Sequence, residues 1–353
     1  MNRKLILPLF LVVQLVGLKI LSFFPEAVER YYSNGFYPPL AKISRITLGR
    51  IPFSVGDLIY FIAIFFLLRW FWKQRKTWRL QWKSNLLSLL GFVSVFYFLF
   101  NLLWAVNYLR IPMYEKLKIE REYTQEELLA FTKLMITKTN AIHSQLVKND
   151  TVKVVLPFSR EQIFEKTQNG YDNLAKAFPY LKYENHSVKP SLLSTPLTYM
   201  GFGGYLNPFT NEAQVNNLIP LHNFATTTGH EMAHQIGIGP ESEANFIGYM
   251  ATIYNDDLYF KYCGYSYALR YCLSNMENFE EGSAIKLLPL IHPGILKNFE
   301  ETEKFWDSHQ TFIDVIFHTF YDNFLKVNQQ KDGLEGYSKF VGLMVNYYEK
   351  RKL

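Results

Sequence analysis

Two histidines and one glutamate stand at the spacing that zinc hydrolases use. Residues 230 to 234 read His-Glu-Met-Ala-His, the HExxH pattern. On a helix, residues four apart lie on one face, so the imidazoles of His230 and His234 can bind a single Zn²⁺. Glu231 can then reach a water molecule at the metal and act as general base. The polar run of residues 226–229 suits the start of this helix, and Gly237 suits its end.

A zinc site needs a third protein ligand, and two glutamates follow closely. Pro240 is placed to open a second helix that runs to about Asn255. Glu241 and Glu243 are two positions apart, so on this helix they point to nearly opposite sides. We favour Glu241, because its side carries small residues that allow close packing on the first helix: Ala244, Asn245, Gly248 and Thr252. Glu243 stays the alternative ligand, and Asn245 is placed to orient a ligand histidine.

These residues resemble the gluzincin pattern, in which a glutamate on a later helix completes the zinc site and a residue four positions on supports it. The stretch between His234 and Glu241 is shorter than in most gluzincins. A broader similarity is to the domain of unknown function 3810 family, bacterial membrane proteins frequent in Bacteroidetes. Short motifs carry it: Pro-Phe-Ser-Val-Gly-Asp at 52–57, Asn-Tyr at 107–108, Pro-Phe-Thr-Asn-Glu-Ala at 208–213, Glu-Ser-Glu-Ala-Asn-Phe at 241–246 and Leu-Lys-Val-Asn at 325–328. The resemblance implies an architecture and no particular substrate.

Three apolar stretches in the first third of the chain predict transmembrane helices, at about residues 5–24, 55–72 and 86–109. Gln14 and Lys19 interrupt the first stretch and are expected to face the helix bundle or to reach its end. A cleaved signal peptide is the alternative for this stretch, but no small-x-small cleavage pattern follows it. The segment between the first two spans is expected to form short helices or loop at the membrane face.

The loop between the second and third spans predicts the orientation. It and its flanks carry six cations and no acid: Arg69, Lys73, Arg75, Lys76, Arg79 and Lys83. By the positive-inside rule this loop is cytoplasmic, so residues 1–110 form a membrane domain and residues 111–353 an extracytoplasmic domain. We expect the inner (cytoplasmic) membrane of a bacterium, with the catalytic domain facing the periplasm. The loop also accounts for the net charge of +6, so nucleic-acid binding is not indicated.

The expected fold class is mainly α with a small β component (α+β), three transmembrane helices followed by a zincin-like domain. Capping-box patterns predict helices from Thr124 to about Val147 and from Ser159 to about Phe178. Residues 187–217 favour a strand pair, and the likeness to zincins implies that its edge binds an extended peptide. The aromatic-rich helical stretches after residue 256 are expected to be mostly core. Cys263 and Cys272 are nine residues apart on one helix, too far apart for a disulfide.

The hypothesis from the sequence is a membrane-anchored zinc metallopeptidase with Zn²⁺ on His230, His234 and Glu241, acting in the aqueous compartment. His222, His318 and Tyr337 are candidates to stabilise the transition-state oxyanion, although a lone His or Tyr among apolar residues is more often part of a core. The expected partners are a peptide or protein substrate and the lipid bilayer, with no organic cofactor. A non-catalytic, zinc-stabilised envelope sensor or scaffold is the alternative, and cell-wall peptides are an alternative substrate.

Overall fold

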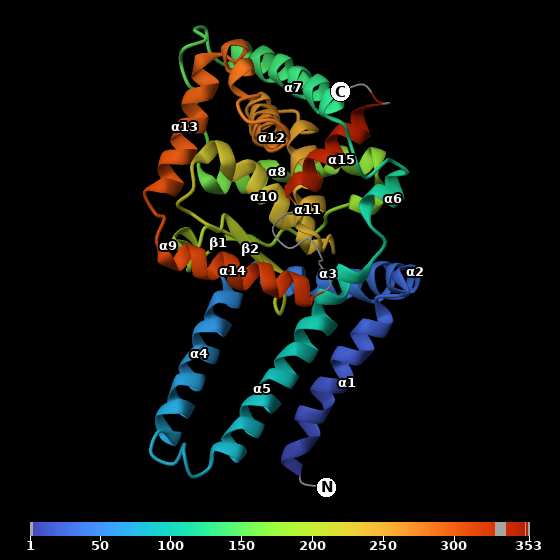
Figure 1. The fold of residues 1–353 in the computed structure, drawn as a ribbon, viewed down its shortest axis with the longest axis vertical. Coiled ribbons are helices and arrows are strands. Elements are labelled where there is room, and N and C mark those ends of the chain that lie inside the picture. Colours follow the sequence, from blue (N-terminus) through green and yellow to red (C-terminus); the bar gives the residue numbers. More distant parts are fainter. Residues whose placement is uncertain (1–2, 329–336, 350, 352–353) are drawn as a thin grey trace.

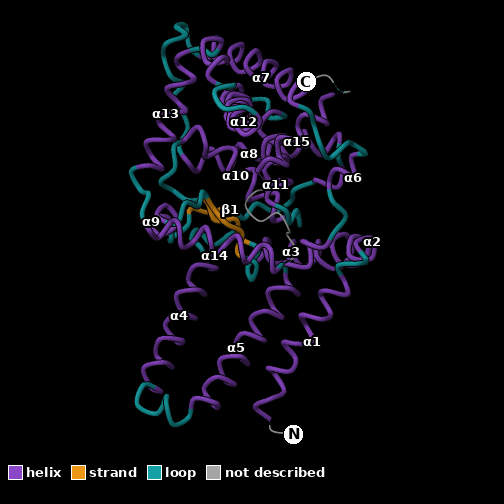
Figure 2. The backbone as a smooth tube through the Cα atoms, in the orientation of Figure 1, coloured by secondary structure: helices purple, strands orange, loops and turns teal. Residues whose placement is uncertain are grey.

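The computed structural model describes residues 3–328, 337–349 and 351, and it shows a helical head standing on a stalk of three long helices (Figure 1). The chain begins at the far end of the stalk and ends on the head. Helices dominate the head, and three short strands lie in its lower part, near the stalk (Figure 2). The expected mainly α fold with a small β component is confirmed.

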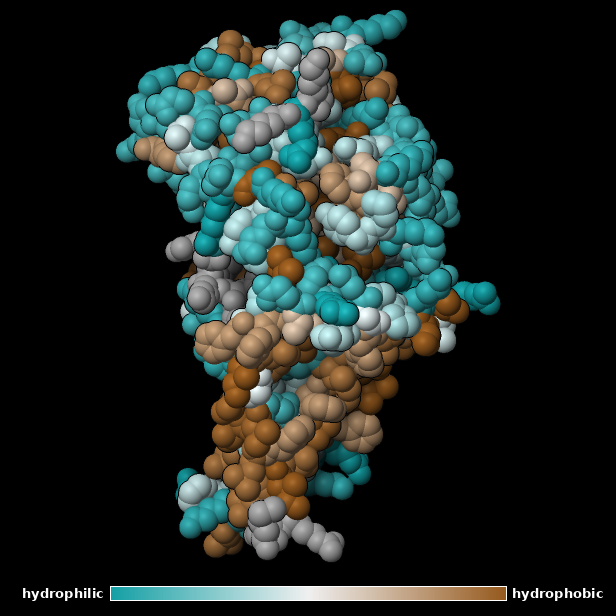
Figure 3. Space-filling view, turned by 90° about the vertical axis from the view of Figure 1, so that its right-hand side faces the viewer, coloured by the Kyte–Doolittle hydropathy of each residue, from teal (hydrophilic) through white to brown (hydrophobic). Residues whose placement is uncertain are grey.

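The stalk consists of α1 (Ile6–Leu21), α4 (Val55–Gln74) and α5 (Trp82–Leu103). Helices α4 and α5 are long and apolar enough to cross a membrane. Helix α1 meets that test only together with the segment Pro25–Leu48, to which it is bent by 99°. The surface of the stalk is correspondingly apolar (Figure 3). Two or three helices of this chain can therefore span a bilayer.

The third predicted span is wrong at its end. It was expected to reach Leu109, but α5 stops at Leu103, and Ala105–Leu109 forms a tight 3₁₀ turn that is buried in the base of the head. The polar Gln14 of α1 faces α5, as expected for the helix bundle. Its amide donates to the backbone oxygen and to the hydroxyl of Ser94, both at 3.1 Å.

The segment between α1 and α4 is helical and lies across the top of the stalk (Figure 1). It comprises α2 (Pro25–Ala27), a π-helical stretch (Val28–Phe36) and α3 (Tyr37–Leu48). Tyr37, Ala41 and Arg45 share one face of α3 and are buried. This segment is therefore part of the base of the head, as well as a connection between spans.

Ten helices complete the head in the described part of the chain. The two capping boxes at Thr124 and Ser159 are confirmed, with both reciprocal hydrogen bonds present in each. The helices are α6 (Met113–Leu117), α7 (Gln125–Leu146), α8 (Arg160–Ala177), α9 (Ser194–Tyr199), α10 (Leu221–Gln235), α11 (Glu241–Ile253), α12 (Leu258–Phe279), α13 (Pro293–Asp307), α14 (Phe312–Val327) and α15 (Tyr337–Glu349). Cys263 and Cys272 are buried free thiols on α12, as predicted.

The sheet is built from β1 (Val188–Pro190), β2 (Gly204–Asn207) and β3 (Glu212–Val215) in the order β1-β3-β2. The predicted strand pair is the antiparallel hairpin of β2 and β3, and β1 adds a parallel strand that the sequence pattern did not separate. Because β3 is central, β2 forms one edge of this sheet. Its outer side is directed away from β3, where another strand could pair with it.

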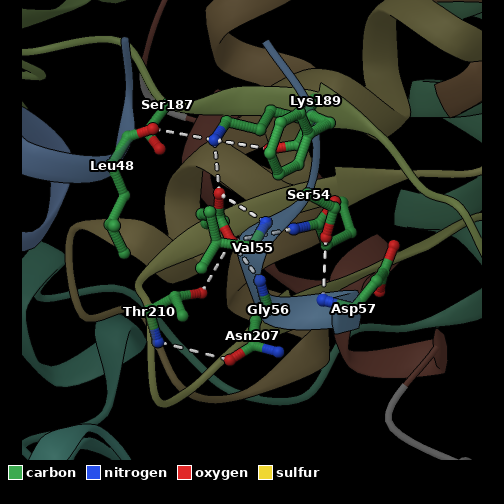
Figure 4. A network of polar contacts seen from close by, with 12 residues as sticks. Leu48, Ser54, Val55, Gly56, Asp57, Ser187, Lys189, Asn207 and Thr210 are labelled. Carbon is green, nitrogen blue, oxygen red and sulfur yellow. Dashed lines mark hydrogen bonds and ion pairs between the residues drawn. The ribbon is translucent and has the colours of Figure 1, made fainter. Parts of the chain in front are cut away.

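A buried polar network fixes the top of α4 to the sheet (Figure 4). The Glu212 carboxylate accepts hydrogen bonds from the backbone N–H groups of Val55 and Gly56, at 3.2 and 2.6 Å, and from the Thr210 hydroxyl at 2.9 Å. It also pairs with the Lys189 ammonium, which donates to two backbone carbonyls of the stalk connection, those of Leu48 and Phe53. We call these groups the stalk–sheet network. They bring the motifs at 52–57 and 208–213 into direct contact.

Candidate metal centre

The HExxH helix, α10, begins earlier than its sequence suggests. The polar run 226–229 was expected to open the helix, but it lies in the middle, because Pro220 supplies the N-terminal boundary and Leu221 is the first helical residue. The helix ends at Gln235, as Gly237 predicted. Gly237 has φ +86, and the N–H of Ile238 donates back to the Ala233 carbonyl at 3.1 Å. The chain turns there directly into α11.

Two glycines let α10 and α11 approach closely. A Cβ atom added at Gly248 would lie 2.8 Å from the backbone nitrogen of His230, and one added at Gly229 would lie 3.2 Å from the Cα of Gly248. Larger residues at either position would separate the two helices. This close contact brings the first turn of α11 beside the histidines of α10.

The side chains of His230, His234 and Glu241 converge on one point. The two Nε2 atoms are 3.0 Å apart, and the Glu241 Oε2 lies 3.2 Å from that of His230 and 3.6 Å from that of His234. Ligands of a tetrahedral zinc ion, bound at about 2.0–2.1 Å, stand about 3.3 Å from one another. The three donors therefore have the types and the mutual spacing that a zinc ion requires.

The two candidate glutamates of α11 have different surroundings. The Glu243 carboxylate accepts a hydrogen bond from the backbone N–H of Met113 at 2.7 Å and is buried at the start of α6. Glu241 faces both histidines, and its other oxygen, Oε1, accepts from the Tyr321 hydroxyl at 2.7 Å. The geometry thus favours Glu241 over Glu243 as a third ligand.

Glu231 lies beside this group of three. Its Oε1 is 4.0 Å from the His230 Nε2, and its Oε2 is buried without a hydrogen-bond partner among the described residues. His230, Glu231 and His234 each bring a ligand atom within 4.8 Å of the others, so this cluster could hold a metal ion. Glu231 is farther from the histidines than Glu241, a position suited to a group that acts beside a metal without binding it.

The cluster is charged in a way that suits a cation. Burial disfavours the ionised form of Glu241, yet His234 and His230 hold its pKa well below the usual range. Burial also opposes protonation of His234, but Glu241 and Glu231 outweigh it and raise that pKa to about 9. Burial raises the pKa of Glu231 to about 7 against the opposing effect of the two histidines. The carboxylates thus stabilise positive charge on this group.

The end of α10 is held by side chains from the first third of the chain. The indole N–H of Trp104 donates to the His234 carbonyl at 2.9 Å. The Tyr37 hydroxyl and the Arg45 guanidinium both donate to the Gln235 carbonyl at 2.9 Å, and Arg110 donates to the Gly237 carbonyl at 2.7 Å. These contacts satisfy backbone oxygens that every helix leaves free at its C-terminus. The stalk and the segment above it therefore position the second histidine.

Two further contacts orient the ligands. The Nδ1 of His234 lies 2.7 Å from the Ile238 carbonyl, the kind of contact that fixes a ligand imidazole in one tautomer. Asn245, expected to orient a histidine, instead accepts from the Tyr267 hydroxyl at 2.8 Å, and its Nδ2 is buried without a partner among the described residues. Asn245 nonetheless lines the same cavity as the cluster.

The cluster opens into a cavity of about 830 Å³. Gly203, Gly204 and Tyr205, from the edge strand β2 and the residue before it, form one wall, and a Cβ atom at Gly204 would come within 2.7 Å of the Glu231 Oε1. The edge strand β2 therefore lies directly against Glu231.

The predicted oxyanion-stabilising residues are not brought together. His318 lines the cavity, where its Nε2 pairs with the Asp314 Oδ1 at 2.9 Å. His222 is buried against the Thr302 hydroxyl at 2.7 Å, and burial lowers its pKa to about 4, as for a core histidine. Tyr337 is the first residue of α15, and its side chain lies outside the described residues. No sequence pattern indicated Tyr321, although it lies one helical turn before the motif at 325–328.

These features define a mainly helical protein with two or three helices able to cross a membrane and a histidine–glutamate cluster able to hold a metal ion. The chain belongs to the family described as protein of unknown function (DUF3810), which matches residues 32–345. The match includes the segment above the stalk, the two later spans and nearly all of the head. No curated protein and no solved structure matches the chain.

Proposed function

We propose that this protein is a membrane-anchored, zinc-dependent metallopeptidase of gluzincin type. The observation that carries the proposal is the convergence of His230, His234 and Glu241 at 3.0–3.6 Å, with the carboxylate of Glu231 beside them in an open cavity. A hydrogen-bonded core cluster would turn its polar atoms toward separate partners. Here three donors are directed at one point.

The residues have distinct roles in this proposal. His230, His234 and Glu241 would hold the metal, which when bound supplies Lewis acidity and lowers the pKa of water. Glu231 takes the proton of the attacking water and passes it to the leaving amine, so one carboxylate serves as base and then as acid. The position of Glu231 supports this role, because its Oε1 lies 4.0 Å from the His230 Nε2, beside the three converging donors.

A peptide is the substrate class that fits the wall beside Glu231. The edge strand β2 offers backbone hydrogen bonds to an extended chain, and the absence of a side chain at Gly204 lets the Glu231 carboxylate lie against this strand. A protein and a cell-wall peptide would both present amide bonds to this edge. The chemistry proposed for the site is the same for both.

The position of the basic loop supports an orientation with the head outside the cytoplasm. The residues between α4 and α5 lie at the end of the stalk remote from the head (Figure 1). If this cationic loop is cytoplasmic, the candidate metal centre faces the periplasm of a bacterium. A fusion reporter at the C-terminus tests this side of the proposal.

The decisive experiment compares wild type with Glu231→Gln in detergent, with zinc content and cleavage of a peptide library measured on the same samples. We expect both proteins to bind zinc and only the wild type to cleave. Glu243→Gln is the matched control, because it changes a buried glutamate on α11 that does not face the histidines. Zinc binding without any cleavage that depends on Glu231 would favour a metal-stabilised sensor or scaffold instead.

A further inference from the structure

The cavity that contains the metal cluster continues down to the stalk. Besides the cluster, its wall includes Tyr60 of α4 and Phe96, Tyr97 and Phe100 of α5. These four aromatic residues belong to the two helices that are long and apolar enough to cross a membrane. A site that received peptides only from water would not need a wall made of membrane helices.

Part of this wall is also outer surface. Phe96 of α5 and Phe320 of α14 both line the cavity, and they are 43% and 62% exposed. Apolar surface covers the stalk and reaches the base of the head (Figure 3). The cavity therefore opens beside residues that bilayer lipid would contact, at the level where α5 enters the head.

Helix α14 carries several large apolar residues on its exposed side, together with the polar Thr319, Asn323 and Lys326. It lies across the top of α4 and α5 (Figure 1). Its exposed face includes Phe312, Val315, Ile316, Phe320 and Val327. The side that lines the cavity includes Asp314, His318 and Tyr321. A helix exposed to water has the opposite arrangement, whereas a helix at a membrane surface turns its apolar face outward to lipid.

We propose that the substrate is a polypeptide anchored in the same membrane, and that the segment next to its apolar anchor enters between α5 and α14. The anchor side meets Phe96 and Phe320, and the segment then follows the edge of β2 to Glu231. This inference rests on the proposed peptidase function and specifies its substrate class. It places cleavage within a few residues of the membrane surface.

The first test uses the full-length protein in phosphatidylethanolamine–phosphatidylglycerol vesicles and a randomised fluorogenic peptide segment. The segment is joined to an apolar transmembrane helix by a spacer of about 4 or about 25 residues, the longer one spanning about 80 Å when extended. A peptide without an anchor is the third arm, and Glu231→Gln is the blank.

We expect the short-spacer substrate to be cleaved about tenfold faster than the long-spacer one, because the longer spacer dilutes the segment near the surface. A site well above the membrane would give the reverse order. If the long-spacer and free peptides are cleaved as fast as the short-spacer one, the substrate class is wrong and the peptidase function stands. If no arm is cleaved above the blank, both proposals fail.

A second test measures lipid contact at α14 without any substrate. Single cysteines are introduced by Val315→Cys and Val155→Cys, labelled with bimane, and exposed to brominated lipids. The two valines are matched, since they are 66% and 67% exposed, and the native thiols are buried. Val155 lies in the loop beside Val154, which bonds to α13 through Asn298. We expect quenching at position 315 alone. Equal quenching, or none at either position, would overturn the membrane contact of α14.

Discussion

Two buried groups of charged residues meet the base of the head, and they are organised in opposite ways. In the stalk–sheet network, the Glu212 carboxylate receives two backbone N–H groups, a hydroxyl and the Lys189 ammonium. At the histidine–glutamate cluster of α10 and α11, the ion pairs of Glu241 within the described residues are with His230 and His234 alone.

The two groups differ in whether their buried polar atoms are fully paired. Glu212 is buried with a fixed cation and donors on both oxygens, so its charge needs nothing further. The cluster instead leaves the Glu231 Oε2 and the His230 Nδ1 buried without partners in the described structure. A buried group that is incompletely paired is costly, and water held by a metal ion in this cluster would supply a hydrogen-bond donor to the Glu231 carboxylate.

The largest expected effect is on protein stability and comes from breaking the ion pair of the stalk–sheet network. Lys189→Met leaves Glu212 buried without its cation, which should lower the free energy of unfolding by about 3–5 kcal/mol. Unfolding of the full-length protein in detergent, followed by circular dichroism, measures the change. The double variant Lys189→Met with Glu212→Gln removes both charges and should recover part of the loss. Unchanged stability in Lys189→Met would show that the network does not hold the stalk.

The next effect is on zinc affinity. It compares the two neighbouring glutamates of α11 as candidate ligands. Glu241→Ala should lower zinc affinity by more than the 10–100-fold that is typical of losing a residue that only supports a ligand. Glu243→Ala should retain zinc but lower stability by about 1–3 kcal/mol, because the Met113 N–H loses its buried acceptor. Zinc titration with a competing chelator measures the first effect. Zinc loss in Glu243→Ala alone would reverse the ligand assignment.

Substitutions at two neighbouring glycines test whether the cavity wall positions the Glu231 carboxylate. In Gly204→Ala the new methyl would lie 2.7 Å from both the Glu231 Oε1 and the backbone oxygen of Gln214, so the carboxylate and the strand must both shift. A displacement of about 1 Å can reduce turnover by about a hundredfold. Gly203→Ala is the control, with its nearest neighbour the Thr227 methyl at 3.3 Å. The two variants are compared by their peptide cleavage rates at constant zinc content. Equal rates would show that β2 does not form part of the active site.

Tyr321 supplies a smaller effect on the metal. Tyr321→Phe removes the hydrogen bond to the Glu241 Oε1 and should weaken zinc binding about tenfold. Tyr267→Phe is the matched control, because that hydroxyl bonds to Asn245 instead of a ligand. Chelator titration should show little change for the control. A Tyr321→Phe protein with full zinc affinity would leave Tyr321 without a positioning role.

The smallest effect concerns a buried histidine away from both groups. Burial holds the pKa of His222 at about 4 in the folded protein, below the ordinary 6.5, so the unfolded chain binds the extra proton first. Stability from this residue is thus full above pH 6.5 and falls between pH 6.5 and 4, by about 1 kcal/mol at pH 5.5. His222→Asn should flatten that part of the pH–stability curve. An unaltered slope would show that other groups cause it.

Local patterns predicted the parts of the site that lie close together in sequence. His230 and His234 are one helical turn apart, and Gly237 and Pro240 mark a helix end and a helix start. The side chains from Glu241 to Thr252 indicated close packing, because small residues recur on one helical face. Each of these inferences needs only helix geometry within about twenty residues.

The parts that were not predictable depend on contacts between distant segments. Tyr321 is 80 residues from Glu241, and Trp104 is 130 residues from His234. No periodicity specifies such pairs. The aromatics of α14 were expected to be mostly core, yet Phe312 and Phe320 are exposed. An apolar stripe has the same appearance in sequence whether it faces a protein core or a membrane.

The contacts that Trp104, Tyr37 and Arg45 make with the end of α10 have a practical consequence. A polypeptide that contains the head without the stalk helices would begin near residue 111. That shortened polypeptide would lose all three side chains and leave the carbonyl groups of His234 and Gln235 bare. The stalk and the head thus depend on each other, and isolating the head would remove the contacts that hold the end of α10, the helix that carries His234.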